Sequence, residues 1–409
     1  MRRKLNKLIK KKLQFLSLLF SPLTLLLRAF RIQVLEMPYF AIGHLALDID
    51  CYLRYRELHK IKSIPILLVR YNTLVHDRPF SSEVCNQFLL NCWKRRIFTI
   101  DHWLLYFLLW PILSSDLLIY KMGRFYSTKA SFTYKPGHCY AAIYSKFKKN
   151  FQPKIHFTSE ESRCGKNLLA QLGLPEGAWY VCFSCREPGY YDNNVDFTKI
   201  RNADIASYEL ALKEIIQRGG WCIRIGSKKS APLSSSLKAL PQIIDYPHSQ
   251  FVSDFMDIFL ISRCLFFLST NSGISNVATI FGISSLMVNY LPIGQLSVFH
   301  RDINIFKLYK SNKTGELIPF KQMLECYLAY SFQDKDYEKF QISAIDNSAE
   351  EIRDAVIEML HEMKIINTPY LEEKELQDKF LTLLNDYNIS YYGSPKIGSA
   401  FLKKYSYLI

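Results

Sequence analysis

The stretch "FFLSTNSGISNVATIFGISSLMVNYLPIG", residues 266–294, decides the fold of this chain. An apolar run that ends at Leu268 predicts a buried strand, and the run 285–288 predicts a second one. Between them, a polar turn at residues 270–273 leads into a small-residue helical pattern. A strand, a helix and a strand in this order predict neighbouring parallel strands with a crossover helix.

The same alternation continues outward from this stretch. It predicts an α/β fold with parallel sheets, because buried strands and helices of 10 to 15 residues take turns along the chain. Strands are predicted at 64–69, 97–100, 179–185 and 219–227, and helices at 82–94, 207–218, 253–262 and 348–363.

Length and composition are those of a globular protein with two or three domains. The chain has 409 residues, of which 49% are hydrophobic and 22% are charged. Of the net charge of +15, nine positive charges precede the first acid, Glu36, so the basicity is mostly confined to the N-terminus. Cys182 and Cys185 form one CxxC pair without a second pair at zinc-site spacing, so we interpret them as strand residues.

The N-terminal segment combines basic and apolar residues. Its charge-free run, 13–27, is too short to cross a bilayer as a helix, Pro22 interrupts it, and Arg28 and Arg31 follow. We expect an interfacial segment on an anionic cytoplasmic leaflet, with an uncleaved signal anchor or a core helix as alternatives. A second apolar run, 103–114, is predicted to be core, with a membrane-facing patch as its alternative.

Three strand ends carry residues suited to an anion. In an open α/β sheet, ligands lie beyond the carboxyl ends of the strands, where backbone N–H groups, hydroxyls and arginines can contact a phosphate. Each such turn alone is usually structural, but three in one sheet predict an anionic ligand such as a diphosphate. The sequence contains neither a complete dinucleotide-binding glycine pattern nor a Walker A pattern, which argues against a dehydrogenase or an NTPase. The candidate donor-binding residues are Ser184, Arg186, Gly189, Arg224, Gly226, Ser227, Thr270, Asn271, Ser272 and Gly273.

At these residues the chain resembles a known family. The segments "CFSCREPGY", "GGWCIRIGS" and "STNSGISNVATIFGISSLMVNYLPIG" resemble the donor domain of GT-B glycosyltransferases of the heptosyltransferase type. The chain also resembles a group of uncharacterised bacterial glycosyltransferases, and its residues 42–54, "IGHLALDIDCYLR", are similar to the N-terminal signature of that group. Related heptosyltransferases tend to have Asp where Asn271 stands, so the sugar contact there is expected to differ.

The resemblance implies a GT-B architecture, in which two Rossmann-like domains face each other across a cleft. The first domain would bind the acceptor and the second the nucleotide-sugar. The expected divisions are a membrane-interface segment at 1–34, an acceptor domain at 35–165, a donor domain at 166–330 and a helical tail at 331–409.

Transfer also needs a base to activate the acceptor hydroxyl. The first strand-to-helix connection of the N-terminal domain offers His44, and the loop after Arg186 offers Asp192 as the next candidate. Asp48 and Asp50 form an Asp-x-Asp pattern, but their amphipathic context predicts helix-surface positions. The family implies no metal and no other cofactor, because protein cations and helix ends would stabilise the leaving diphosphate.

The sequence therefore predicts a metal-independent glycosyltransferase. It would move a sugar from a nucleotide-sugar to a glycan or lipid-linked acceptor, as a peripheral protein on the cytoplasmic face of the cell membrane. A sugar-nucleotide epimerase of the same fold and a non-catalytic anion-binding protein remain alternatives. No nucleic-acid module is recognised, so nucleic acid is not an expected partner.

Overall fold

The structure is a computed structural model that describes residues 20–37, 39–69, 84–113, 119–120, 140–188, 198–299, 301–386 and 388–409. The chain divides into two compact units. The first holds residues 1–132 and 153–157, and the second holds 133–152 and 158–409. Helix α7 spans residue 165, the boundary predicted from the sequence, and belongs to the second unit.

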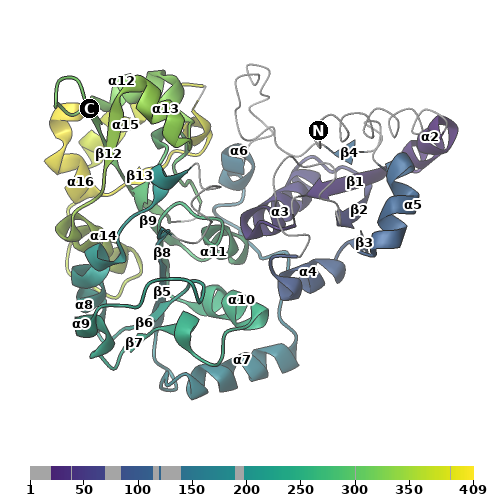
Figure 1. The fold of residues 1–409 in the computed structure, drawn as a ribbon, viewed down its shortest axis with the longest axis horizontal. Helices are drawn as coiled ribbons and strands as arrows, with labels where there is room; N and C mark the ends of the chain where they lie inside the picture. The colour runs from purple at the N-terminus through teal and green to yellow at the C-terminus, as the bar shows by residue number, and fades with distance from the viewer. Residues whose placement is uncertain are drawn as a thin grey trace, which may run out of the picture. The chain divides into compact units, whose positions relative to one another are not determined.

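The first unit contains a four-stranded parallel sheet in the order β3-β2-β1-β4 (Figure 1). Its register pairs Ile32 with Ile64 and Ile66 with Phe98. The strands are β1 (Ile32–Met37), β2 (Ile64–Val69), β3 (Phe98–Ile100) and β4 (Ile119–Tyr120). The helices are α2 (Ser21–Ala29), α3 (Ile42–Leu58), α4 (Gln87–Lys94) and α5 (Trp103–Leu113).

The second unit contains a seven-stranded sheet in the order β13-β10-β9-β8-β5-β6-β7, with every pair parallel. Figure 1 shows α8 and α14 on one face of this sheet and α10 and α11 on the other. The strands are β5 (Tyr180–Ser184), β6 (Trp221–Arg224), β7 (Ile243–Ile244), β8 (Phe267–Ser269), β9 (Ser285–Tyr290), β10 (Ile303–Phe306) and β13 (Lys396–Ile397). A separate antiparallel pair is formed by β11 (Leu308–Ser311) and β12 (Ile342–Ile345).

The helices of the second unit fill the connections between its strands. Side chains at the N-cap residue cap several of them, and α14 has the complete capping box of Ser348 and Glu351 that its sequence indicated. They are α6 (Tyr140–Ser145), α7 (Ser159–Gln171), α8 (Glu209–Gln217), α9 (Ser235–Lys238), α10 (Asp254–Arg263), α11 (Ser275–Phe281), α12 (Phe320–Glu325), α13 (Asp334–Phe340), α14 (Ala349–Glu362), α15 (Lys374–Leu383) and α16 (Ser399–Lys404).

The stretch that decides the fold forms β8, α11 and β9. All residues of both strands are buried, as the uninterrupted apolar runs predict for strands covered on both faces. Helix α11 ends at Gly282, whose φ of 78° closes the helix in the left-handed conformation. The predicted α/β fold with parallel sheets is confirmed.

The final 79 residues take part in the second unit. Strand β13 pairs with β10 at the edge of the sheet, and α14 packs against α8. Glu358 of α14 accepts hydrogen bonds from the backbone N–H and the hydroxyl of Ser399, at 2.7 and 3.2 Å. These bonds tie α14 to the start of α16.

Pro22 begins a helix instead of interrupting one. It lies in the first turn of α2, where the missing N–H has no helical acceptor and the fixed φ suits the turn. The remainder of the predicted interfacial segment, residues 1–19, lies outside the described residues. Within the part of the chain that is described, no helix has the length and apolarity needed to cross a membrane.

Asp302, just before β10, is a buried carboxyl whose ionisation opposes folding. Burial raises its pKa to about 7, although Ser297 and the backbone N–H of Ser285 donate hydrogen bonds to it. Because the folded-state pKa lies above the unfolded value, the stability that protonation confers is full below about pH 4 and is lost as the pH rises to about 7. We expect the wild type to lose stability relative to Asp302→Asn across this range, by up to about 1.4 kcal/mol per pH unit.

Urea unfolding of both proteins between pH 4.5 and 7.5 measures this difference. The comparison cancels the other carboxyl groups, which titrate alike in the two proteins. A constant difference across the range would show that Asp302 does not titrate there.

Candidate functional site

The order of the strands places a ligand-binding edge in the second unit. Read from β7, the sheet runs β7-β6-β5-β8-β9-β10, which is the doubly wound order 3-2-1-4-5-6. In this arrangement the chain reverses its direction of winding between strands 1 and 4, here β5 and β8. The crossover connections leave in opposite directions at this point and open a crevice beyond the carboxyl ends of the two strands.

Hydroxyl groups join β5 and β8 at this switch point. The hydroxyl oxygens of Ser184 and Ser269 lie 2.8 Å apart, and both side chains are buried. The backbone N–H of Arg186 donates to Oγ1 of Thr270 at 2.9 Å. Ser184, Arg186 and Thr270, three of the predicted donor-binding residues, are therefore brought together here. Ser269 was missed, although its position directly before Thr270 was visible in the sequence.

The turn after β8 is held by its own polar groups. Ser269 Oγ lies 3.5 Å from Ser272 Oγ, and the Ser275 hydroxyl donates to the Ser272 carbonyl at 2.6 Å. The Asn271 side chain donates to the Leu291 carbonyl at 2.8 Å, which ties the turn to the end of β9. Asn271 thus has a structural contact in addition to its predicted role, and Gly273 is exposed at the same turn.

Two arginines lie beside this turn. Arg186 Nη2 donates to the Thr198 hydroxyl at 2.8 Å, and Arg201 Nη2 donates to the backbone carbonyl of Asn271 at 2.5 Å. The guanidinium carbon of Arg201 also lies 5.0 Å from the centre of the Phe332 ring. Arg201 was missed because nothing in its sequence context marks it, and only the fold brings it to the turn.

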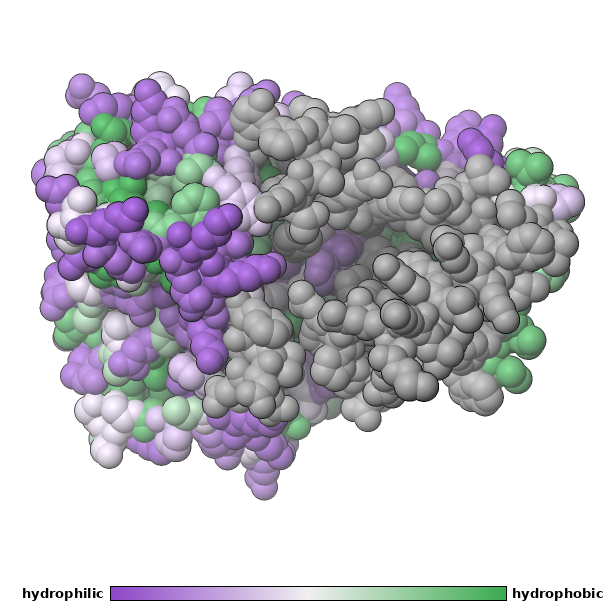
Figure 2. Space-filling model, turned by 45° about the horizontal axis from the view of Figure 1, so that its top comes forward, coloured by the Kyte–Doolittle hydropathy of each residue, from purple (hydrophilic) through white to green (hydrophobic). Residues whose placement is uncertain are grey.

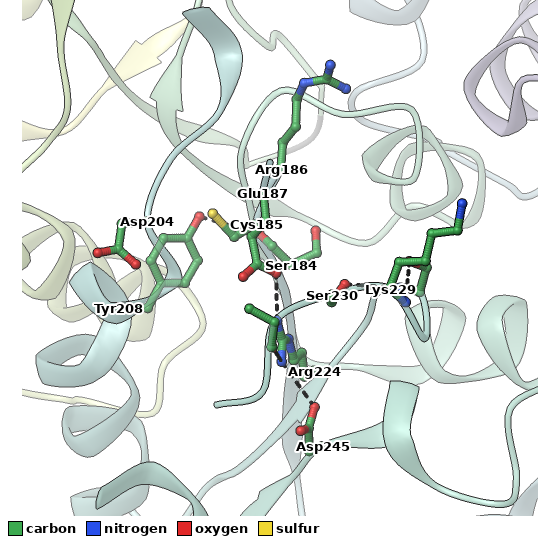
Figure 3. A network of polar contacts seen from close by, with 12 residues as sticks. Ser184, Cys185, Arg186, Glu187, Asp204, Tyr208, Arg224, Lys229, Ser230 and Asp245 are labelled. Atoms are coloured by element: carbon green, nitrogen blue, oxygen red, sulfur yellow. Dashed lines mark hydrogen bonds and ion pairs between the residues drawn. The ribbon is translucent and has the colours of Figure 1, made fainter. Parts of the chain in front are cut away.

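Arg224 has a different environment from Arg186. It is 1% exposed and donates to Glu187 Oε2 at 2.6 Å, to Asp245 Oδ1 at 3.3 Å and to the Ala231 carbonyl at 2.7 Å. Figure 3 shows Arg224 between Glu187 and Asp245, while the Arg186 side chain points away from this network. Since two carboxylates already neutralise Arg224, we reassign it from direct diphosphate contact to support of the loops after β5, β6 and β7.

Glu187 was not among the predicted residues. Its burial raises the pKa of its carboxyl, and the charge and hydrogen bond of Arg224 offset only part of that effect. The adjacent residues Arg186 and Glu187 were the sequence signal for this role. A carboxylate next to a proposed phosphate contact needs a cationic partner, because it would otherwise repel the phosphate.

Two further predicted donor residues, Gly226 and Ser227, lie in the loop after β6. Gly226 packs closely there, since an added Cβ would lie 2.9 Å from the Ser230 hydroxyl. Ser227 Oγ accepts from the Lys229 backbone N–H at 3.2 Å, so it stabilises the turn locally. Gly189 and Asp192 lie outside the described residues.

His44 lies in the first turn of α3, in the connection that follows β1 of the first unit. Its Nδ1 is 3.0 Å from Asp48 Oδ2, one helical turn further on, and the His44 side chain is 31% exposed. Burial lowers the His44 pKa, but the hydrogen bond and the charge of Asp48 outweigh it, so the pKa is raised. With the Nδ1 proton directed to Asp48, Nε2 carries the lone pair that can accept a proton.

The predicted helix-surface positions of Asp48 and Asp50 are wrong. Asp48 is 7% exposed, and Asp50 is fully buried in an ion pair with Arg54. Helix α3 contacts both β1 and α4, and its residues from Leu45 to Tyr52 are all buried, so both carboxylates are covered although they point to different sides of the helix. Pairing with His44 and Arg54 makes this burial possible.

No family model matches the chain, and no curated protein matches it significantly. Among solved structures, it is similar to ADP-heptose LPS heptosyltransferase II of E. coli, with 13% identity, 63% of this chain and 84% of that chain covered, and a TM-score of 0.34. A family 9 glycosyl transferase from Veillonella parvula has 11% identity, covers 67% of this chain and 83% of its own, and has a TM-score of 0.34.

A third similar structure is the glycosyltransferase TibC from enterotoxigenic E. coli, with 11% identity, 81% of this chain and 77% of that chain covered, and a TM-score of 0.42. The resemblance to heptosyltransferase-type glycosyltransferases that the sequence indicated is thus found again among solved structures. Identities and TM-scores this low carry no argument about activity, which has to be inferred from the site itself.

The expected absence of a cofactor is contradicted. TibC is described as an iron-containing glycosyltransferase, so the resemblance does not imply the absence of a cofactor. We withdraw that expectation for the present chain. Among its described residues, no group of three or more His, Cys, Asp or Glu side chains is arranged to hold a metal ion.

Proposed function

We propose that this protein is a glycosyltransferase that takes its sugar from a nucleotide-sugar donor. The acceptor is a glycan or a lipid-linked glycan, and the protein works at the inner face of the cell membrane. The donor's diphosphate lies at the carboxyl ends of β5 and β8, and His44 serves as the base that activates the acceptor hydroxyl.

One observation carries this proposal. The switch point of a 3-2-1-4-5-6 sheet coincides with the link between β5 and β8 that Arg186 and Thr270 make, at 2.9 Å. A diphosphate needs cations and hydrogen-bond donors at one place. Arg186 and Arg201 supply the cations there, and Ser184, Ser272 and Thr270 supply hydroxyls.

The proposed reaction moves one proton and breaks one bond. The acceptor hydroxyl gives its proton to Nε2 of His44 while its oxygen bonds to the anomeric carbon of the sugar. The bond between that carbon and the diphosphate oxygen breaks, and the diphosphate keeps the electron pair. Asp48 stabilises the protonated imidazole, since it lies 3.0 Å from Nδ1.

We expect Arg186→Ala to weaken the binding of the best sugar-nucleotide about 10- to 150-fold, because a hydrogen bond to a charged group contributes about 1.5–3 kcal/mol. A thermal-shift screen against nucleotides and sugar-nucleotides finds the ligand, and isothermal titration calorimetry measures the affinity. Arg218→Ala is the matched control. It removes the same charge from an exposed pair with Glu214 on α8, remote from the switch point.

Equal loss of affinity in both variants would indicate a general charge effect. Unchanged affinity in Arg186→Ala would remove Arg186 from the donor site.

Activity assays with the same protein and the same sugar-nucleotide distinguish the two alternative functions from the transferase. An epimerase converts the sugar-nucleotide in the absence of any acceptor, whereas a transferase consumes it at a substantial rate only when the acceptor is present. An anion-binding protein without catalysis turns over neither, and its binding of nucleic acid would fall steeply with salt.

A further inference from the structure

Helices α2 and α5 of the first unit each have one packed apolar face and one exposed apolar face. The two helices contact each other, and α2 also contacts β1. Leu27 of α2 and Tyr106, Leu109 and Leu113 of α5 pack into the core cluster of the sheet. The opposite faces carry leucines that are 42–63% exposed, namely Leu23, Leu25, Leu26, Leu104, Leu105 and Leu108.

The amino edge of the same sheet carries three further exposed apolar residues. Phe30 immediately precedes β1, and Ile64 and Phe98 are the first residues of β2 and β3. The three strands are parallel neighbours, so these residues lie at one edge. Their exposures are 64%, 54% and 69%, high for such large apolar side chains.

We call these nine residues the apolar face of the first unit. Figure 2 shows hydrophobic residues beside hydrophilic ones at the right-hand end of the molecule, where Figure 1 draws α2 and α5. Large apolar side chains exposed together on two contacting helices mark an interaction site on soluble domains.

Exposed cations accompany the apolar residues of this face. Arg31 follows Phe30, Lys62 comes two residues before Ile64, and Arg96 comes two residues before Phe98. Arg28 is exposed in the last turn of α2.

Two carboxylates near these residues in sequence already have cationic partners, because Glu57 pairs with Lys154 and Asp101 pairs with Lys94. The surface therefore combines apolar side chains with an excess of positive charge.

The chain that precedes α2 adds to the same charge. Residues 2–12 contain seven Lys or Arg and no acid. Seven residues separate this segment from Phe20, the exposed N-cap residue of α2. An anionic bilayer is the partner that offers both an apolar layer and a layer of negative charge to such a surface.

We propose that the apolar face of the first unit docks on an anionic lipid bilayer, with α2 and α5 lying in the interface. This docking rests on the proposed function, because it would hold the acceptor-binding unit beside a lipid-linked acceptor. It assigns membrane contact to α5 as well as to the N-terminal segment.

The experiment is co-sedimentation of the full-length protein with vesicles of phosphatidylcholine, with and without phosphatidylglycerol. We expect binding that requires phosphatidylglycerol and falls with salt. Leu105→Glu with Leu108→Glu should lower the partition coefficient at least about 100-fold, since each leucine is worth about tenfold. Arg28→Gln with Arg31→Gln should lower it about 5-fold per cation in vesicles that contain phosphatidylglycerol.

The matched control is Phe340→Glu with Leu371→Glu. It makes the same change in charge at two exposed apolar residues of the second unit, and its binding should equal that of the wild type. Circular dichroism and thermal unfolding check that each variant is folded.

Binding that survives in Leu105→Glu with Leu108→Glu would overturn the proposal and leave membrane contact to residues 1–19. A dimer that these substitutions dissociate, without vesicle binding by the wild type, would assign the face to a second copy of the chain and would also overturn it. Sugar-nucleotide binding is measured without vesicles, so failure of the donor site and failure of the docking face give separate results.

Discussion

Replacement of His44 by alanine is expected to lower kcat for glycosyl transfer about 10²- to 10⁴-fold, the range that general base catalysis supplies. The affinity for the nucleotide-sugar should not change, because the proposed contacts of His44 are to the acceptor hydroxyl and those to the diphosphate come from other residues. Steady-state kinetics with the donor and acceptor, together with calorimetry for the donor alone, measure the two quantities. A variant that retains the wild-type kcat would exclude His44 as the base.

Asp48→Asn is the companion variant that tests how His44 works. A base acts in its neutral form, so the rate should fall as the pH drops through the His44 pKa. Asp48 raises that pKa against the lowering effect of burial. Removal of the Asp48 charge should therefore move the acidic limb of the pH–rate profile to lower pH, with a lower kcat at the plateau. If the acidic limb stays in place, a group other than His44 causes it. A purely structural role for Asp48 would also leave the limb at the same pH.

The largest expected effect on stability is that of Asp50→Asn. Asp50 and Arg54 are both fully buried in α3, and Arg54 Nε donates to Asp50 Oδ2 at 2.5 Å. Loss of the carboxylate charge removes the ion-pair partner of the buried Arg54 guanidinium, and removal of one partner of a buried ion pair costs about 3–5 kcal/mol. The free energy of unfolding of the first unit in urea, followed by circular dichroism, measures the loss.

Two further variants show whether the charge causes this loss. Asp50→Leu combined with Arg54→Met removes both charges and should recover most of the stability, because an apolar pair replaces a buried ion pair at little cost. Lys213→Met breaks the partly exposed pair of Lys213 with Glu209 in α8, an i,i+4 helix pair, and should cost only about 0.3–0.5 kcal/mol. A double variant as unstable as Asp50→Asn would mean that packing, and not charge, determines the effect.

The secondary structure of the second unit could be predicted closely from local patterns. The runs at 179–185 and 253–262 contain β5 and all but the last residue of α10, and Ser253 caps α10 as its position predicts. The signal is strong because each element is bounded by a turn or a cap and because buried parallel strands are uniformly apolar.

The first unit shows where local patterns are insufficient. The run 103–114 was predicted to be core, yet α5 buries Tyr106 and Leu113 and exposes Leu104, Leu105 and Leu108. A helix that is apolar on every face gives no periodicity from which the buried side can be read. The alternative, a membrane-facing patch, now stands as the proposal for this helix.

The sequence by itself determined the α/β class, the strand ends that carry polar residues and the position of His44 after the first strand of its unit. The tertiary structure decided which of those residues share a site. Arg186 and Arg224 both follow buried strands in the sequence, but only the fold places Glu187 and Asp245 against Arg224 and brings Arg201 to the turn after β8. Secondary structure follows from contacts within a few residues, whereas the charge state and access of a side chain depend on groups that are distant in the chain and meet only when the sheet is assembled.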